Sequence, residues 1–304
     1  MKNFLAISFS VFSLILVSLL FFRSTKKDDE IRMKEFQDNY AIYALDLPEE
    51  LTFAGEPVPM VLIDVKERFD RELLVNTYWQ SQTLLLIKRA SRWFPLIDSI
   101  LLANDIPKDF KYLALAESGF MNVVSPSGAA GYWQFLKRTG IEYDLKINEN
   151  IDQRYDVELS TVAATKYLNK AHKEFSNWTM TAASYNMGVD GLKKLVNSQK
   201  VNSYYELLLS NETSRYIFRI LALKQICEHP ESYGFHLRQR DLYKPYSYSS
   251  IKVDSSIMNL SDFSIRNNIN YKELKLLNPW LRQTELLNPE GIVFNIKIVN
   301  KLSN

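Results

Sequence analysis

The chain has 304 residues, 46% of them hydrophobic and 24% charged, which excludes a disordered or low-complexity protein and allows a substantial core. Its 37 basic and 35 acidic side chains leave a net charge of only +2, so the composition does not indicate nucleic acid as a partner. The single cysteine excludes an internal disulfide, and the three histidines, His172, His229 and His236, lack the spacing of metal ligands. We therefore expect no metal and no other cofactor.

Residues 1–22 are predicted to direct the chain to a membrane. Residues 4–22 carry no charge and, as a helix, would span roughly 28 Å, close to the hydrocarbon thickness of a bilayer. The run ends at Phe22 and Arg23 without the small residues of a cleavage site, which favours an uncleaved anchor over a signal peptide. The flanking positive charges do not settle its orientation, so the placement of the remaining chain outside the cytoplasm depends on the candidate site below.

The middle of the chain is predicted to be a tether followed by one helical domain. Residues 23–64 are polar and then rich in proline, which suits a tether and an extended strap. Residues 65–232 show helical periodicity throughout and are expected to form an all-helical domain, so the fold class is mainly α. The expected helices span residues 71–90, 94–103, 107–117, 132–138, 157–175, 179–186 and 214–227.

Residues 245–304 are predicted to form a second, small α+β module. A short strand at 251–253 is followed by helices at 260–267 and 271–277, and alternating apolar residues at 291–299 indicate another strand. About fifty residues are too few for an independent enzyme, so a binding or docking element is expected.

Glu117 stands out because it ends the helix expected over 107–117 on the same face as Phe110, Leu113 and Ala114. Burial on this apolar face and the negative end of the helix dipole both disfavour a carboxylate. We therefore expect its pKa to be raised toward neutrality, where the side chain can donate a proton. A lone glutamate at a helix end is more often a solvated acid, so its catalytic assignment depends on the neighbouring segments.

Two further segments supply neutral hydrogen-bonding groups. Residues 125–131 form a loop of small side chains that lets a bulky ligand approach the backbone, and Gln134 is expected to present its amide from a rigid helix start. Tyr185 and Asn186 lie together at the end of the helix at 179–186. A groove of such groups around one acid is typical of carbohydrate binding.

Six segments share the order and spacing of one known family: AESGF at 116–120, GAAGYWQF at 128–135, DQRYD at 152–156, STVAA at 160–164, SYNMG at 184–188 and ETSRY at 212–216. Through them the chain resembles the catalytic domain of soluble-type lytic murein transglycosylases, closest to the membrane-bound D type. The C-terminal module resembles a degenerate LysM peptidoglycan-binding repeat through residues 260–265 and 271–279. The resemblance implies a lysozyme-like catalytic domain at 65–232 and a LysM-like module at 245–304.

The resemblance also implies a reaction, in which the β-1,4 bond between N-acetylmuramic acid and N-acetylglucosamine is cleaved and a 1,6-anhydro ring closes on the muramyl sugar. Glu117 would act as general acid and then as base, and the substrate's acetamido group would replace a second carboxylate. Gln134 and Asn186 would hold the N-acetyl group or glycan hydroxyls. Tyr185 would lie near the reacting centre, and Ser118 and Tyr216 would line the groove.

Two residues depart from the usual family pattern, since leucine is more common at Tyr132 and alanine at Ser184. Tyr132 would add a ring and a hydroxyl to the groove lining.

Several of the named residues have structural alternatives. Gln134 could be a hydrogen bonder within a helix start, and Tyr185 and Tyr216 could be core aromatics with satisfied hydroxyls. Trp133 and Trp178 are expected in the core. A charged network that fixes the turn into the helix at 157–175 is expected from Asp152, Arg154 and Asp156.

Two other functions stay open at this point. A lysozyme-type hydrolase would need a second carboxylate across the groove, for which Glu142, Asp144 and Glu149 are candidates. A non-catalytic envelope protein would bind peptidoglycan through the groove and the C-terminal module. The expected partners are peptidoglycan glycan strands and, through residues 1–22, a membrane, in a bacterial cell envelope with the catalytic domain on the periplasmic or wall side.

Overall fold

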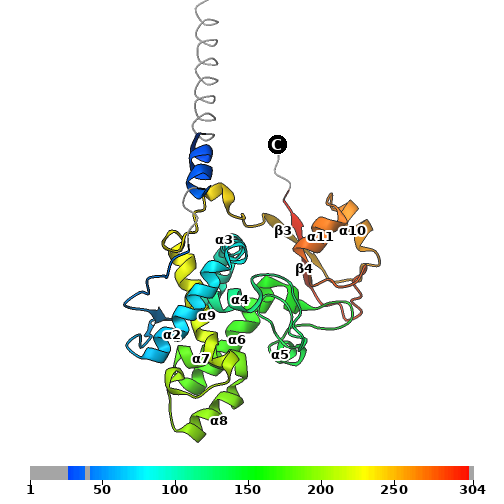
Figure 1. The fold of residues 1–304 in the computed structure, drawn as a ribbon. Coiled ribbons are helices and arrows are strands. Elements are labelled where there is room, and N and C mark those ends of the chain that lie inside the picture. Colours follow the sequence, from blue (N-terminus) through cyan, green and yellow to red (C-terminus); the bar gives the residue numbers. More distant parts are fainter. Residues whose placement is uncertain (1–26, 38–41, 301–304) are drawn as a thin grey trace, which may run out of the picture. The chain divides into compact units, whose positions relative to one another are not determined.

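The computed structural model describes residues 27–37 and 42–300 (Figure 1). The chain separates into two compact units, 1–44 and 45–304, and the second unit holds every candidate site residue. In the first unit residues 27–37 are helical. The predicted anchor at 1–22 lies outside the described residues. Within the described ranges, no helix combines the length and apolar character that a membrane crossing requires.

The second unit begins with an extended segment and a small hairpin. Strand β1 (Thr52–Phe53) pairs antiparallel with β2 (Glu56–Pro57), and Gly55 in the turn has a φ of 81°. Phe53 is fully buried and its ring meets that of Phe110 edge to face at 5.3 Å between centroids. The strap expected from the sequence is thus packed onto the helical domain at this point.

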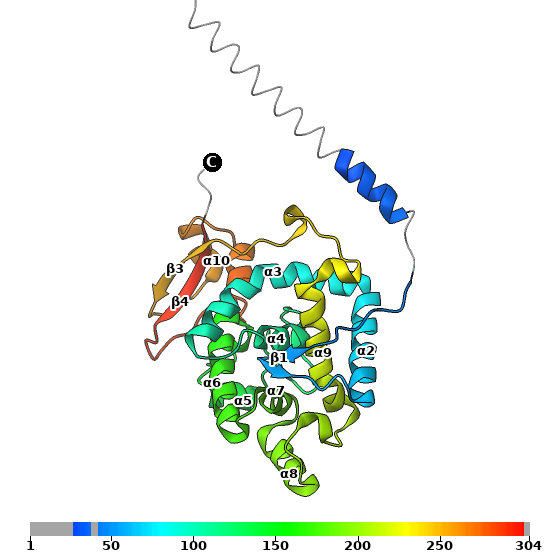
Figure 2. The same ribbon diagram turned by 90° about the vertical axis from the view of Figure 1, so that its left-hand side faces the viewer.

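The domain that follows is built from helices, as the fold class predicted. They are α2 (Ile63–Tyr78), α3 (Gln80–Ala103), α4 (Phe110–Ser118), α5 (Lys137–Glu142), α6 (Val157–Phe175), α7 (Trp178–Met187), α8 (Val189–Gln199) and α9 (Asn211–Glu228), with short 3-10 turns η1 (Gln153–Tyr155), η2 (Tyr204–Glu206), η3 (Pro230–Tyr233) and η4 (Gln239–Asp241). Helix α9 packs against α2, α4 and α7 and lies between α2 and α4 in Figure 2. This arrangement brings the last turn of α4 next to the first half of α9.

Side-chain caps explain where several helices begin. Asp156 accepts hydrogen bonds from the second and third amides of α6, Asn177 caps α7 and Ser210 caps α9. The predicted span 157–175 agrees with α6 because the cap and the apolar period are both strong signals.

Three helix predictions were wrong. The chain breaks at Trp79 between α2 and α3, so 71–90 is not one helix. Helix α3 then runs through Pro95 to Ala103, because one lost backbone hydrogen bond is outweighed by burial of its apolar face. Residues 132–134 form a turn instead of a helix start, and α5 begins only at Lys137. Helix α8 had not been predicted.

The C-terminal module has the predicted order of strand, two helices and strand. Strand β3 (Tyr248–Val253) pairs antiparallel with β4 (Phe294–Val299), with Tyr248 opposite Val299, and helices α10 (Leu260–Arg266) and α11 (Tyr271–Leu277) connect them (Figure 1). The module has its own apolar core, in which Trp280 stacks on Phe294 at 5.4 Å between centroids.

Candidate active site

Glu117 lies in the last turn of α4, a helix whose apolar face is embedded in the domain. Phe110, Leu113 and Ala114 on the same face are fully buried, as the sequence pattern predicted. Gly119 ends the helix with a left-handed φ of 58°, a conformation that glycine adopts without strain. The Glu117 side chain is therefore half-buried at the point where the buried helix meets a loop.

Tyr216 is the closest polar partner of this acid. It lies on α9, is buried, and its hydroxyl donates a hydrogen bond to Oε1 of Glu117. Burial, together with the negative charge and the hydrogen bond of Glu117, raises the pKa of the Tyr216 phenol well above its usual range. Tyr216 therefore remains a neutral donor, and the structure brings it into direct contact with Glu117.

Burial raises the pKa of Glu117 to about 6, which is the direction expected from the sequence. The hydrogen bond from Tyr216 and the positive charge of Arg219 act in the opposite direction, while the charge of Glu212 raises the pKa further. A carboxyl group that titrates near neutrality can serve both as a proton donor and as a proton acceptor.

An ion cluster around the buried Glu72 lies beside Tyr216 in sequence and was not predicted. Glu72 of α2 is buried and its carboxylate lies 2.7 Å from Nε of Arg215 and 3.9 Å from Nε of Arg219. Glu72 shares the apolar face of α2 with Phe69 and Leu73, which is the same signal that had drawn attention to Glu117. The cluster fixes the part of α9 that carries Tyr216 and Arg219.

Tyr185, near the end of α7, is held against the loop after α4. Its hydroxyl donates to the backbone carbonyl of Trp133 at 2.7 Å, and its ring meets those of Trp133 and Phe135. Burial and the negative charge of Glu117 raise the pKa of this phenol well above its usual range. Tyr185 therefore remains a neutral phenol.

Asn186, the next residue of α7, is half-buried. Its Oδ1 accepts a hydrogen bond from the Thr213 hydroxyl at 2.9 Å. Among the described residues, nothing accepts a hydrogen bond from its Nδ2, so this amide group has donors to offer to a ligand.

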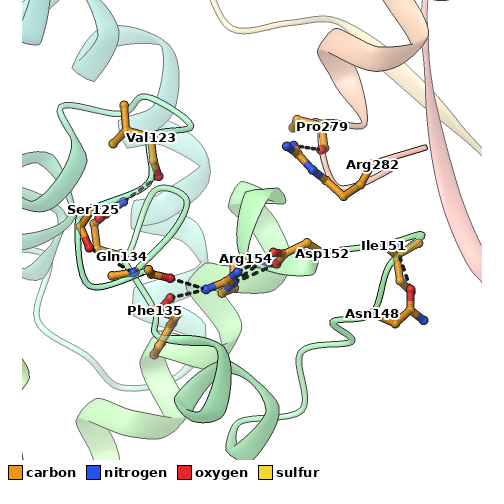
Figure 3. Close-up of polar contacts among 12 residues, drawn as sticks. Val123, Ser125, Gln134, Phe135, Asn148, Ile151, Asp152, Arg154, Pro279 and Arg282 are labelled. Atoms are coloured by element: carbon orange, nitrogen blue, oxygen red, sulfur yellow. Dashed lines mark hydrogen bonds and ion pairs between the residues drawn. The ribbon is translucent and has the colours of Figure 1, made fainter. Parts of the chain in front are cut away.

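Gln134 lies in a tight turn and not at a helix start. Its backbone adopts a left-handed φ of 49°, and Nε2 donates to the carbonyls of Val123 at 3.1 Å and Gly131 at 2.8 Å (Figure 3). Both amide hydrogens are thus used inside the loop, which leaves Oε1 as the acceptor of this half-buried side chain.

Ser118 is buried and its hydroxyl is used within the protein. It donates to the carbonyl of Tyr132 at 2.8 Å and accepts from the amide of Phe120 at 3.1 Å. The Ser118 hydroxyl therefore joins α4 to the following loop, and both of these hydrogen bonds are made within the protein.

Tyr132, which the resemblance suggested would add a ring and a hydroxyl to the groove lining, lies in an aromatic cluster. Its ring is buried, packs against Trp93 and Phe120, and lines a pocket together with Tyr246 and Lys297. The residue that departs from the family pattern therefore contributes to packing around the C-terminal module.

The charged network predicted at 152–156 is only partly as expected. Arg154 pairs with Asp152 through Nη2 at 2.7 Å, and its Nη1 donates to the carbonyls of Gly128 and Phe135 (Figure 3). Asp156 does not join this pair. It caps α6, and its Oδ2 forms an ion pair with Nζ of Lys297 in β4 at 3.0 Å. The network therefore fixes the loop before α5 as well as the turn into α6.

The two tryptophans expected in the core differ from each other. Trp133 is fully buried and its Nε1 donates to the hydroxyl of Thr161 at 2.8 Å. Trp178 is only half-buried and stacks on the imidazole of His172 at 3.6 Å.

The three alternative carboxylates lie in surface positions. Glu142 and Asp144 form exposed ion pairs with Lys170 at 3.0 Å and Lys166 at 2.7 Å. Glu149 is exposed, and its backbone carbonyl bonds to Gln283. The acid whose charge does act on Glu117 is Glu212, which is exposed at the start of α9.

Comparison with known protein families gives two matches. The Transglycosylase SLT domain matches residues 101–208, and the Soluble lytic transglycosylase C-terminal LysM-like domain matches residues 249–301. The chain carries a transglycosylase SLT domain. This SLT domain includes Glu117, Gln134, Tyr185 and Asn186, while Tyr216 lies eight residues beyond its matched end.

Two curated relatives are similar to the chain over most of its length. Both are named membrane-bound lytic murein transglycosylase D, from Escherichia coli strain K12 and from Escherichia coli O6:H1 strain CFT073, and each is 27% identical over 243 residues. The alignment covers 77% of this chain and 52% of each relative, so the chain with its SLT domain spans about half the length of the curated relatives it matches.

Proposed function

We propose that the protein is a peptidoglycan lytic transglycosylase, a carbon-oxygen lyase that cleaves between N-acetylmuramic acid and N-acetylglucosamine and leaves a 1,6-anhydromuramyl end. The observation that carries the proposal is the half-buried Glu117, with a pKa of about 6, hydrogen-bonded by Tyr216 within a chain that contains an SLT domain. The names of the relatives agree with this reaction.

In the first step the protonated carboxyl of Glu117 gives its proton to the glycosidic oxygen, and the bond from that oxygen to the anomeric carbon breaks. Tyr216 occupies Oε1 as a donor, so the proton is carried by Oε2. The positive charge on the anomeric carbon is stabilised by the acetamido oxygen of the same sugar, which makes a second carboxylate unnecessary.

In the second step the carboxylate of Glu117 takes the proton of the muramyl 6-hydroxyl, whose oxygen attacks the anomeric carbon and closes the anhydro ring. The acid is then protonated again, and no water is consumed. Because attacking and leaving oxygens belong to one bound glycan, orientation supplies much of the rate enhancement. Glu142 and Asp144, two of the candidates for a second carboxylate, are engaged in surface ion pairs, while the acid whose charge acts on Glu117 is the exposed Glu212.

The neutral residues around Glu117 are proposed to orient the glycan. Asn186 presents unused Nδ2 hydrogens and Gln134 an unused Oε1, which together suit the carbonyl and the N–H of an acetamido group. Tyr185 supports the Trp133 backbone beside the reacting centre. Ser118 is omitted from this set because its hydroxyl is fully used inside the protein.

The proposal is tested by incubating purified peptidoglycan with the wild-type protein and with Glu117→Gln. The masses of the released muropeptides are then measured by mass spectrometry. The wild type should release products that are lighter by one water than the hydrolytic products and have no reducing muramyl end. Glu117→Gln should release nothing and still sediment with peptidoglycan. Reducing muramyl ends would indicate a lysozyme-type hydrolase, and wild-type binding without cleavage would indicate a non-catalytic envelope protein.

We also propose that the protein acts in the bacterial cell envelope, held there by residues 1–22 with the SLT domain on the periplasmic or wall side. The uncharged run at 4–22 and the membrane-bound relatives support this placement. A reporter that is active only outside the cytoplasm, fused to the C-terminus, should be active. A silent reporter would contradict the exported placement.

A further inference from the structure

The C-terminal module is joined to the SLT domain by shared structure at residues 150–152. The side chain of Ile151 is only 4% exposed and belongs to the apolar core of the module. Ile151 also forms a β-bridge with Leu281, and the amide of Asp152 donates to the carbonyl of Trp280 at 2.9 Å. A segment of the helical domain is thus part of the module's own core.

A buried ion pair adds a second connection. Nζ of Lys297 in β4 lies 3.0 Å from Oδ2 of Asp156, and both side chains are less than 10% exposed. The guanidinium of Arg282 lies over the ring of Tyr155, 4.1 Å from its centroid. Buried charges keep one geometry because any other leaves a desolvated charge unpaired, so these contacts define how the module docks.

The same short segment reaches the candidate site on its other side. Arg154 is oriented by three hydrogen bonds from its side chain to Asp152, and its Nη1 donates to the carbonyls of Gly128 at 2.9 Å and Phe135 at 3.0 Å (Figure 3). One guanidinium therefore holds both ends of the turn that contains Gln134. A planar guanidinium with fixed N–H directions is well suited to such a task.

We propose that the C-terminal module is a positioning element of the active site, in addition to any contact it makes with the wall. The module holds residues 150–156, Asp152 orients Arg154, and Arg154 fixes the 128–135 turn so that Gln134 faces the glycan. Arg154 and Ile151 are thus positioning residues that act through Gln134. The expected effect on catalysis rests on the proposed lytic activity. The effect of the module on the conformation of the 128–135 turn does not depend on that activity.

The competing role for the module is that of a tether that only raises the local concentration of wall. The two roles separate on a short soluble substrate, a tetrasaccharide of alternating N-acetylglucosamine and N-acetylmuramic acid. A tether has nothing to concentrate in that case, so loosening the module would leave kcat unchanged. A positioning element lowers kcat on the same substrate, because small misplacements of an orienting group slow the reaction.

The experiment uses the full chain with Arg154→Lys and Ile151→Ala. Arg154→Lys keeps the positive charge and loses the planar guanidinium that donates to both ends of the turn. It should lower kcat on the tetrasaccharide roughly 10-fold to 100-fold, with KM changed by less than about twofold. Ile151→Ala should lower kcat several-fold, and the conservative Ile151→Val should restore most of it. Exposed Arg138→Lys and Lys252→Ala serve as controls and should behave as wild type.

Hydrogen exchange provides a readout that does not depend on activity. In folded Ile151→Ala, amides of residues 128–135 should exchange faster than in Ile151→Val, although the substitution lies outside that turn. Unchanged exchange there, or an unchanged kcat in both Arg154→Lys and Ile151→Ala, would overturn the inference. If the wild type proves inactive on all glycans, the proposed function fails, and the exchange measurement alone still decides whether the module positions the turn.

Discussion

The hydroxyl of Tyr216 donates a hydrogen bond to Oε1 of Glu117, which links α9 to the last turn of α4. The contact orients the carboxyl group and also lowers its pKa, against the stronger effect of burial. The balance places the pKa at about 6, in a range where one group can give a proton and take it back.

Replacing Tyr216 by phenylalanine should raise the pKa of Glu117, because it removes a hydrogen bond that favours the carboxylate. Since the reaction starts from the protonated acid, wild-type kcat/KM should fall as pH rises through about 6. In Tyr216→Phe this fall of kcat/KM, the alkaline limb of the pH profile, should move to higher pH. Arg219→Gln should move it in the same direction, because the Arg219 charge also lowers this pKa. A limb that stays in place, or moves to lower pH, in both variants would remove Glu117 from the titration.

The raised pKa also predicts how stability depends on pH. A carboxyl that holds its proton more tightly in the folded state contributes stability that is fully present below its unfolded pKa, near 4.5, and is lost as pH rises through about 6. The wild type should therefore lose about 2 kcal/mol relative to Glu117→Gln between about pH 4 and about pH 7. Urea unfolding of both proteins at the two pH values measures the difference. An equal difference at both values would mean that the pKa of Glu117 is not raised by folding.

Asn186→Asp should weaken glycan binding without loss of the fold. The aspartate keeps the acceptor used by Thr213 and loses the Nδ2 hydrogens proposed to meet the substrate. We expect KM, or the dissociation constant of a product glycan, to rise roughly 10-fold, the cost of a lost hydrogen bond to a buried polar partner. Thr213→Val is the matched control, because it removes the bonds of the Thr213 hydroxyl to Asn186 and Ser210 and leaves the Nδ2 hydrogens of Asn186 in place. Comparable losses in both variants would make Asn186 a structural residue.

Gly131 and Gly128 form a matched pair for testing the turn. A Cβ on Gly131 would lie 1.9 Å from the carbonyl oxygen of Arg154, whereas a Cβ on Gly128 would meet nothing within 4 Å. Both have positive φ, so Gly128→Ala should cost about 1 kcal/mol from backbone strain alone. Gly131→Ala should cost at least about 3 kcal/mol, because backbone must move. Denaturant unfolding measures both, and similar losses would refute the close approach of Arg154 to the turn.

Local sequence signals were sufficient for much of the fold. The predicted span of α11 agrees with the structure because Asn270 and Glu273 form a capping box, and that of α6 because Asp156 is a strong cap. The apolar face of α4 also predicted the burial that raises the pKa of Glu117, whose side chain is half-buried. These features depend on residues a few positions apart, which is why periodicity reveals them.

The site details depend on contacts that periodicity does not contain. The left-handed turn at Gln134 is held by Arg154, and Phe135 and Arg154 are 19 positions apart in sequence. The buried carboxylate of Glu72 is paired with Arg215, which lies 143 positions later in the sequence. The hydroxyl of Ser118 donates to the backbone carbonyl of Tyr132, a contact that the motif around Glu117 does not reveal.

The most direct test of the account is to digest peptidoglycan with the wild-type protein in water labelled with heavy oxygen. Ring closure by the muramyl 6-hydroxyl consumes no water, so the released muramyl ends should be anhydro ends without label, and Glu117→Gln should release none. Incorporation of heavy oxygen at the muramyl anomeric carbon would show that water is the nucleophile and would contradict the proposed transglycosylase reaction.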